Sequence, residues 1–598
     1  MNDVGSFIRA GTLDELRSRG RMVLGTPGGA VLVVAEGENV VALDNRCPHM
    51  GFPLHRGSVE DGILTCHWHH ARFDLRSGST FDLWADDVPL RAVRVVDGEV
   101  WVAATAAPRD EATHWRRRLH DGLTHNISLV IGKAVLGATA AGIPATELVR
   151  DALLYGAAHR DRWGVGLTTL MAAANLMPML DDQDRFLALF HGIAAVADDC
   201  EGEAPRSDTE PLGGTVPFET LARWFRHWVR VRHRTGAERT LRTAIVAGAT
   251  PQGLAATILI AVTDRYFADG GHALDFAAKA FEAVDLAGWK YADAVLPSIV
   301  PVLTASIGGE EMDSWRHPVD LIGMAERAQP EFAEALAAGR SRRGGFRAHA
   351  VLGRGVLGDD PEAIFRALVT ALHDGAAPAD VARAVAFAAA LRIAHFGTSN
   401  DHSDWETAHH AFSYANAAFA LMVRATDGAA DAETEALCLR AAVHGALAVY
   451  LARYLNVPPA RLPRGGERSL APGELRRAFL DACDRQQQVL EAAQLAASHL
   501  AAGYPAAELI ALLGHALLRE DAGFHMMQNL QAAVHEYLAW HGEAEAAPIL
   551  IAAARYLAAH SPTLRARRQT ADVARRLMRG SPVHENDAAL PDQLDRSD

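Results

Sequence analysis

Residues 47–51 read Cys-Pro-His-Met-Gly and residues 66–69 read Cys-His-Trp-His, and these two short motifs decide the fold of the N-terminal part. The first has C-x-H spacing, the second has C-x-x-H spacing, and sixteen residues lie between His49 and Cys66. Short β-branched runs with turns surround both motifs, and Asp97-Gly98 is a strong hairpin signal between two such runs. The sequence therefore predicts a small all-β domain that carries the two motifs on loops.

The donor atoms of the two motifs indicate a metal centre. Two thiolates, from Cys47 and Cys66, and two imidazoles, from His49 and His69, form the ligand set of a mixed-ligand [2Fe–2S] cluster, with one iron on each pair. Tetrahedral zinc also accepts two cysteines and two histidines. However, zinc fingers usually pair Cys with Cys and His with His along the chain, whereas each loop here carries one of each.

The sequence around the motifs favours the cluster. Residues from about 5 to 105 resemble Rieske-type ferredoxins and the Rieske domains of ring-hydroxylating oxygenases. The resemblance rests on the two motifs and on the flanking segments 42–46, 51–54 and 71–78. It implies a Rieske [2Fe–2S] domain that uses Cys47, His49, Cys66 and His69 as ligands and transfers single electrons.

Departures from the respiratory members of this family predict the properties of the cluster. Phe52 and Trp68 stand where those proteins have two further cysteines, so their disulfide cannot form here. Ala71 and Phe73 replace residues whose hydroxyls lie near the cluster, and fewer hydrogen bonds stabilise the reduced state less. We expect a low potential, near the roughly −150 mV end of the Rieske range.

Composition changes near residue 107, from short β-runs to Ala- and Leu-rich sequence with helical periodicity. The fold class that follows is multidomain: a small all-β Rieske domain followed by a large all-α helical domain. We predict the Rieske domain at 1–106, a linker at 107–111, the helical domain at 112–578 with a possible split near 456–473, and a disordered tail at 579–598.

Helix signals are visible throughout the second part. The predicted helices include 216–234, 272–288, 361–373, 378–396, 403–425, 472–500, 505–519 and 522–541. In the first of these, Trp224, Trp228 and Val231 are expected to face inward. The apolar stretch 127–143 is interrupted by Lys133 and is short for a membrane span, so it reads as a buried helix.

The net charge and the cysteine count exclude several classes of protein. A net charge of −15 and a sequence pI near 6.0 argue against a nucleic-acid or membrane partner. Five cysteines, two of them in the metal motifs, do not form a disulfide framework. The first residues lack the basic and apolar pattern of a signal peptide. These features together predict a cytoplasmic protein.

The helical part contains few sequence signals for a second metal site. It lacks the spaced Asp/Glu and His motif of ring-hydroxylating oxygenases, and its two Glu-x-x-His matches, at 111–114 and 406–409, are few enough to arise by chance. Histidines that interrupt apolar helices remain as candidates for catalysis or for a second iron site. They are His125, His159, His409, His410 and His525. Each taken alone is typical of a structural histidine, and we predict that several of them line one pocket.

The stretch from His120 through His125-Asn126 to Tyr155 resembles the start of the questin oxidase-like family. Those proteins are helical and His-rich, and the resemblance implies oxygenative chemistry on an aromatic or polyketide-like substrate. The chain has no Gly-rich dinucleotide fingerprint at a strand–helix junction, so a separate NAD(P)H-dependent reductase is expected to donate the electrons.

Three functions remain open from the sequence. In the first, the Rieske cluster feeds electrons to a helical oxygenase or oxidase domain that acts on a small organic substrate. In the second, the protein is a non-enzymatic electron carrier, and the helices form a docking or oligomerisation scaffold. In the third, the protein is a redox sensor whose cluster state changes helix packing. The substrate and the oligomeric state are not specified by the sequence.

Overall fold

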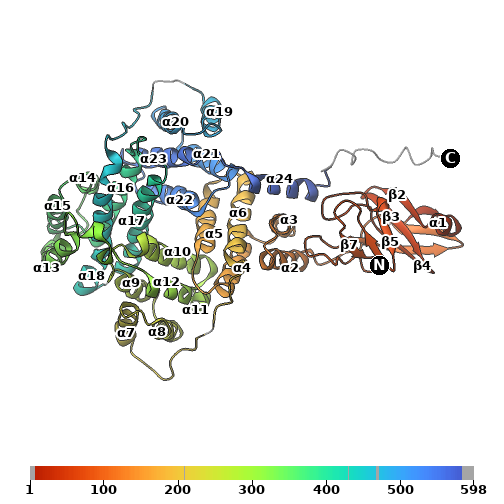
Figure 1. Ribbon diagram of the computed structural model, residues 1–598, viewed down its shortest axis with the longest axis horizontal. Coiled ribbons are helices and arrows are strands. Elements are labelled where there is room, and N and C mark those ends of the chain that lie inside the picture. Colours follow the sequence, from red (N-terminus) through yellow and green to blue (C-terminus); the bar gives the residue numbers. More distant parts are fainter. Residues whose placement is uncertain (1–6, 208, 428–429, 467–469, 582–598) are drawn as a thin grey trace. The chain divides into compact units, whose positions relative to one another are not determined.

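The computed structural model (Figure 1) describes residues 7–207, 209–427, 430–466 and 470–581. By its contacts the chain forms two compact units. The first contains the residues up to Ala145 together with those from Gln569 onward, and the second is Thr146–Arg568.

The first unit is built on three small antiparallel sheets. Their strand orders are β1-β10-β9, β2-β3-β4-β8 and β5-β6-β7. The strands are β1 (Phe7–Thr12), β2 (Arg21–Thr26), β3 (Gly29–Glu36), β4 (Asn39–Asp44), β5 (Ser58–Glu60), β6 (Ile63–Thr65), β7 (Arg72–Asp74), β8 (Leu90–Arg91), β9 (Val93–Val96) and β10 (Glu99–Ala103). A short helix, α1 (Leu13–Arg19), follows β1. Asp97-Gly98 joins β9 to β10, as the sequence predicts.

Strand β3 lies at the centre of this module. Its residues alternate between two apolar clusters: Leu32 and Val34 face one, and Val31 and Val33 face the other. The first of these clusters also contains Cys47 and Cys66, so the two metal-motif loops are anchored on the same core. One loop follows β4, and the other joins β6 to β7.

Two helices complete the first unit. The change from strand to helix falls between Ala103 and Glu111, near the predicted linker at 107–111. Helices α2 (Glu111–Thr124) and α3 (Ser128–Ala140) then form a hairpin that belongs to the compact unit of the β-module. Helix α3 is the buried apolar helix that the sequence predicts around Lys133.

The second unit is helical. Its principal helices are α4 (Ala145–His159), α5 (Val165–Leu176), α6 (Asp182–Cys200), α7 (Phe218–Arg230), α8 (Arg234–Val246), α9 (Pro251–Val262), α10 (His272–Ala287), α11 (Ala292–Val295), α12 (Val300–Ala305), α13 (Leu321–Gly339), α14 (His349–Val356), α15 (Pro361–His373), α16 (Pro378–Ala394), α17 (Asp404–Thr426), α18 (Ala432–Leu451), α19 (Pro472–Cys483), α20 (Val489–Ala501), α21 (Ala506–Arg519), α22 (Phe524–Ala539) and α23 (Ala546–Ala559). Helix α24 (Ala566–Met578) begins in this unit and ends in the first. The fold class predicted from the sequence is therefore confirmed.

Helix α17 lies at the centre of the helical unit and contacts α9, α10, α16, α18 and α22 (Figure 1). Its residues Trp405, Ala408, Phe412 and Ala415 form a buried apolar stripe. Helix α16 is buried around its whole circumference, which explains why its sequence is apolar without a clear period.

Two local predictions about these helices are wrong. The segment 472–500 is not one helix, because α19 ends at Cys483 and α20 begins at Val489. The polar residues between them offer no apolar face to bury, and Gln487 has a φ of 60°. Helix α7 buries Leu221, Phe225 and Val229 instead of the predicted face, and Trp224 is 41% exposed.

Segments Trp289–Glu311 and Ala432–Asn456 are long and apolar enough to span a membrane by composition alone. Most of each apolar window, 78% and 83%, is buried among other helices, as in the core of a helical domain. The second compact unit runs across the predicted split at 456–473. Of the predicted disordered tail, residues 582–598 lie outside the described residues.

Candidate functional sites

The two metal-motif loops have matching backbone turns. In the first, the Gly51 N–H donates to the Cys47 carbonyl at 2.8 Å, and the Cys47 N–H donates to the Phe52 carbonyl at 2.8 Å. In the second, the Cys66 N–H donates to the Ala71 carbonyl, also at 2.8 Å. Gly51 has a φ of 84°, which a residue with a side chain adopts only at a cost. Each loop is therefore a closed turn with a buried cysteine at its base.

The four predicted ligands meet at one place. The rings of His49 and His69 are 4.9 Å apart and nearly perpendicular, and the thiols of Cys47 and Cys66 hydrogen-bond to each other. The Nδ1 atom of His49 is buried and has no hydrogen-bond partner among the described residues. A buried nitrogen without a partner is costly unless something binds it. Two adjacent sulfurs and two adjacent imidazoles thus fit the two ends of a [2Fe–2S] cluster.

The electrostatics of the loops suit metal ligation. The hydrogen bond from the Cys47 thiol, with further N–H groups from Trp68 and His69, lowers the pKa of Cys66 to about 6. Burial lowers the pKa of His49 to about 4, so this ring is neutral near pH 7 and keeps a lone pair for a metal. Burial also lowers the pKa of His69, although that side chain is exposed.

Aromatic side chains surround the ligands. Trp84 lies edge-on to His49 at 4.5 Å, and Trp68 lies 4.4 Å from His69. Phe52 and Trp68, which stand in the disulfide positions of respiratory relatives, contact each other at a centroid distance of 6.0 Å. All five cysteines are free. The two loops thus meet through an aromatic contact at the positions where the respiratory relatives have their disulfide.

The histidines predicted for the helical part do not all converge. His125 is exposed at the end of α2, and its Nδ1 bonds to the Asp121 carbonyl. His159 stacks on Tyr155 at the end of α4. Each of these two histidines is thus bonded to a carbonyl within its own helix end.

Three of the candidate histidines, His409, His410 and His525, lie close together. The Nε2 atoms of His410 and His525 are 3.1 Å apart, and the His409 ring lies 5.0 Å from that of His525. His272, which the sequence reasoning missed, completes the group. One ring nitrogen from each of His272, His410 and His525 lies within 4.8 Å of the others, and all three side chains are half-buried. We refer to His272, His410 and His525 as the three-histidine cluster.

The backbone before His272 is unusual. Phe267, Asp269, Gly270 and Gly271 all have positive φ values, and the first two are not glycines. Conformations of this kind are costly and concentrate at functional sites. They form the turn Ala268–Gly271, which sets His272 as the first residue of α10. In the sequence, the glycine pair directly before His272 is the signal that could have identified this residue.

The surroundings keep His410 and His525 uncharged near neutral pH. Burial and the neighbouring histidines lower the pKa of His410 and of His525 to about 4 each. Burial also lowers the pKa of His409, and its two ring nitrogens lie 3.2–3.3 Å from the side-chain amides of Gln528 and Asn529. Neutral imidazoles present lone pairs, so the cluster can bind a divalent metal.

Carboxylates lie beside the cluster. An oxygen of Glu406 is 3.5 Å from Nδ1 of His525, and an oxygen of Asp275 is 3.5 Å from Nδ1 of His272. Glu406 belongs to one of the two Glu-x-x-His matches. Glu111, of the other match, bonds to Arg109 and Trp115.

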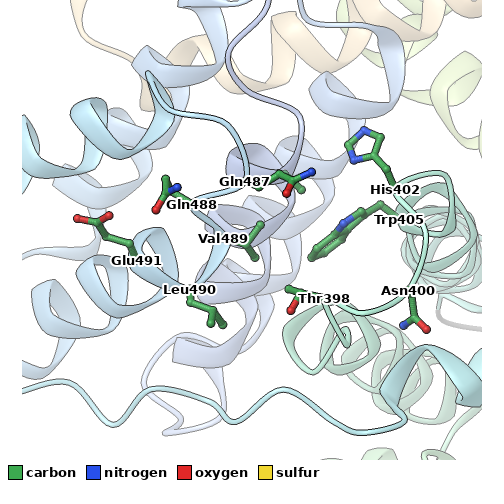
Figure 2. A pocket seen from close by; sticks show the side chains of 10 residues that line it. Thr398, Asn400, His402, Trp405, Gln487, Gln488, Val489, Leu490 and Glu491 are labelled. Carbon is green, nitrogen blue, oxygen red and sulfur yellow. The ribbon is translucent and has the colours of Figure 1, made fainter.

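A pocket of about 350 Å³ lies between the start of α17 and the start of α20 (Figure 2). Trp405 points across it toward Val489, and neutral polar side chains surround the two. The lining residues are Thr398, Asn400, His402, Trp405, Gln487, Gln488, Val489, Leu490, Glu491 and Ala559. Ring contacts lead inward from Trp405 to Tyr556 at 6.1 Å and from Tyr556 to His409 at 5.4 Å.

Comparison with known proteins identifies the domain that carries Cys47, His49, Cys66 and His69. The family model of the Rieske [2Fe–2S] domain matches residues 7–91. These residues form a Rieske [2Fe–2S] domain, so the family predicted from the two motifs is confirmed. Because a Rieske domain transfers electrons, the match supports an electron-transfer role for residues 7–91.

Individual relatives cover the same region. Apoptosis-inducing factor 3 of Homo sapiens is 30% identical over 130 residues, and that of Mus musculus is 28% identical over 131 residues. The match spans only about a fifth of this chain and a fifth of those proteins, 21% in each case.

Two solved structures also match, each over 17% of this chain. One is a chain from the complex of reduced oxygenase and oxidized ferredoxin in carbazole 1,9a-dioxygenase, with 18% identity, a TM-score of 0.17 and 97% of that chain covered. The other is the ferredoxin of carbazole 1,9a-dioxygenase from Nocardioides aromaticivorans IC177, with 30% identity, a TM-score of 0.16 and 99% of that chain covered.

Proposed function

We propose that this protein is an iron-dependent oxidase or oxygenase in which the Rieske domain supplies single electrons to a metal at the three-histidine cluster. The observation that carries the proposal is the meeting of three histidine nitrogens within 4.8 Å in the helical unit. Imidazole ligands suit iron, copper, nickel and zinc. A metal that changes its oxidation state fits a chain that also carries an electron donor, which favours iron over zinc.

Carboxylates extend the possible donor set. Glu406 is exposed and reaches His525, so it can turn toward a metal and add an oxygen ligand. Two histidines and one carboxylate with open positions are the ligands of a large class of non-haem iron oxygenases. A bound iron of this kind would supply dioxygen activation. The protein's own residues hold the imidazoles of His410 and His525 neutral and set His272 at the start of α10.

We propose that the substrate is a small organic molecule with an aromatic or polyketide-like ring, bound in the pocket beside Trp405. The volume, about 350 Å³, is within the range of small-molecule sites. Trp405 offers an aromatic surface, and Asn400 and Gln487 offer neutral hydrogen-bonding groups. The electron donor would be a separate NAD(P)H-dependent reductase, and the location would be the cytoplasm.

Metal stoichiometry tests the proposal. The full chain, reconstituted anaerobically with ferrous iron and sulfide, should contain three irons and two acid-labile sulfides. His410→Ala and His525→Ala should each lower the iron to two, while the rhombic signal of the reduced cluster, with an average g near about 1.9, persists. His125→Ala is the matched control, because this exposed histidine lies outside the cluster, and it should keep three irons.

A different result selects the rival function. Two irons in the unmodified protein, with no further binding of Fe²⁺, Co²⁺ or Zn²⁺, would leave an electron carrier with a helical scaffold. Binding of zinc alone, without oxygen consumption when a reductase supplies electrons, would also exclude the oxygenase.

A further inference from the structure

The helical hairpin α2–α3 contacts the first ligand loop of the Rieske domain. The family match ends at residue 91, and α2 begins at Glu111, so the hairpin is an addition to the matched domain. Lys133 of α3 is buried, and its Nζ donates a hydrogen bond of 2.7 Å to the Pro48 carbonyl. Pro48 lies between the ligands Cys47 and His49. A buried ammonium group thus binds the backbone of the cluster loop.

Lys133 is held there by a buried ion network. It pairs with Asp86, whose other oxygen accepts a hydrogen bond of 2.6 Å from Arg118 of α2. Arg118 also donates to the carbonyls of Leu83 and Ala85 at 2.8 and 2.7 Å. These residues flank Trp84, which packs against His49. The network therefore connects both helices to both sides of the His49 ligand.

Close packing between the two helices fixes the position of Lys133. Gly137 lies one turn further along α3, and a Cβ atom there would be only 2.1 Å from the Trp115 ring of α2. Trp115 is in turn held by a hydrogen bond of 2.9 Å from its Nε1 to Glu111. The helices can approach this closely only because position 137 has no side chain, and that approach brings Lys133 to the loop.

We propose that Lys133 is a positioning residue that fixes the Pro48 loop and raises the reduction potential of the cluster. Reduction by a reductase, or by dithionite in the assay, would add one electron and so one negative charge to the cluster that these ligands hold, and no bond would form or break. A buried cation within hydrogen-bond reach of the ligand loop stabilises that charge, because surroundings poor in water screen it weakly. The negative charge of Asp86 weakens this stabilisation of the reduced cluster. The positive charge of Arg118 in turn compensates part of the charge of Asp86.

The test is a redox titration of the full chain, followed by the EPR signal of the reduced cluster. Lys133→Gln keeps a hydrogen-bond donor but removes the charge, and it leaves Asp86 less compensated. We expect the equilibrium constant for reduction to fall at least tenfold, which is a downward shift of about 59 mV for one electron. Arg117→Gln is the matched control, because Arg117 pairs with Asp87 on the exposed side of α2. It should leave the potential unchanged.

A second variant separates charge from folding. Asp86→Asn removes the negative member of the network and should raise the equilibrium constant for reduction, and the double variant with Lys133→Gln should return it toward the unmodified value. If Lys133→Gln assembles the cluster and the constant stays within twofold, the proposal is overturned. If that variant fails to assemble a cluster, an unchanged constant in Asp86→Asn overturns it instead.

Discussion

A carboxyl group between the two helices that carry His409, His410 and His525 provides a quantitative test of the fold. Glu536 of α22 is fully buried, and one of its oxygens accepts a hydrogen bond of 2.8 Å from Asn416 of α17. Its other oxygen has no hydrogen-bond partner among the described residues. Burial raises the pKa of Glu536 to about 8, so the folded protein keeps this group protonated at neutral pH.

The direction of the pH dependence follows from linkage. The folded pKa lies above the unfolded value of about 4.5, so the folded state binds the extra proton between these two pH values. The contribution of Glu536 to stability is complete below about pH 4.5 and is lost as the pH rises toward about 8. The slope approaches about 1.4 kcal/mol per pH unit, which gives roughly 2 kcal/mol between about pH 6 and pH 7.5.

Glu536→Gln removes this titration while keeping a similar shape and a group that can bond to Asn416. We expect the variant to gain roughly 2 kcal/mol in unfolding free energy relative to the unmodified protein over that pH interval. Urea unfolding followed by far-ultraviolet circular dichroism measures the difference at each pH. Glu331→Gln, at an exposed position of α13, is the control. Parallel stability curves for Glu536→Gln and the unmodified protein would refute the buried, protonated carboxyl.

Three further predictions concern the two units. His69→Cys should replace a neutral ligand by an anionic one and lower the cluster potential toward the ferredoxin range near about −400 mV, as measured by redox titration. Gly137→Val should destabilise the first unit by about 1–3 kcal/mol through its clash with Trp115, which a denaturant titration of the cluster absorbance would detect. Trp405→Ala should cost about 3–5 kcal/mol because it removes a ring stacked on Phe396 at 3.8 Å, and the EPR signal of the cluster should not change.

The Rieske site was predictable because its ligands are local in the sequence. Each loop carries its two ligands within four residues, and the turn that orients them is closed by neighbouring backbone groups. The replacement of the disulfide cysteines by Phe52 and Trp68 could also be read directly. Their mutual contact could not, because it depends on how the two loops pack.

The helical site was only partly predictable, because its members come from three helices far apart in the chain. His409 and His410 interrupt an apolar stripe, which marked them as candidates. His125 and His159 interrupt apolar sequence in the same way, but they lie at helix ends and bond to nearby carbonyls. His272 escaped notice because its placement depends on the turn before α10, which no periodicity reveals.

Lys133 is another residue whose partner the sequence does not reveal. As a single charge in an apolar stretch, it identified 127–143 as something other than a membrane span. The sequence could not reveal its partner, because Asp86 lies 47 residues earlier and the pair forms only when α3 folds back on the β-module.

The unequal exposure of the two histidine ligands has a consequence for the order in which electrons enter and leave the cluster. His49 is half-buried and packs against Trp84, whereas His69 is exposed. Electron tunnelling weakens steeply with distance, so a donor and an acceptor that both use the His69 edge must dock there in turn. Under that arrangement, an excess of the proposed reductase would occupy the His69 edge and slow delivery to the acceptor, and turnover would pass through a maximum as the reductase concentration rises.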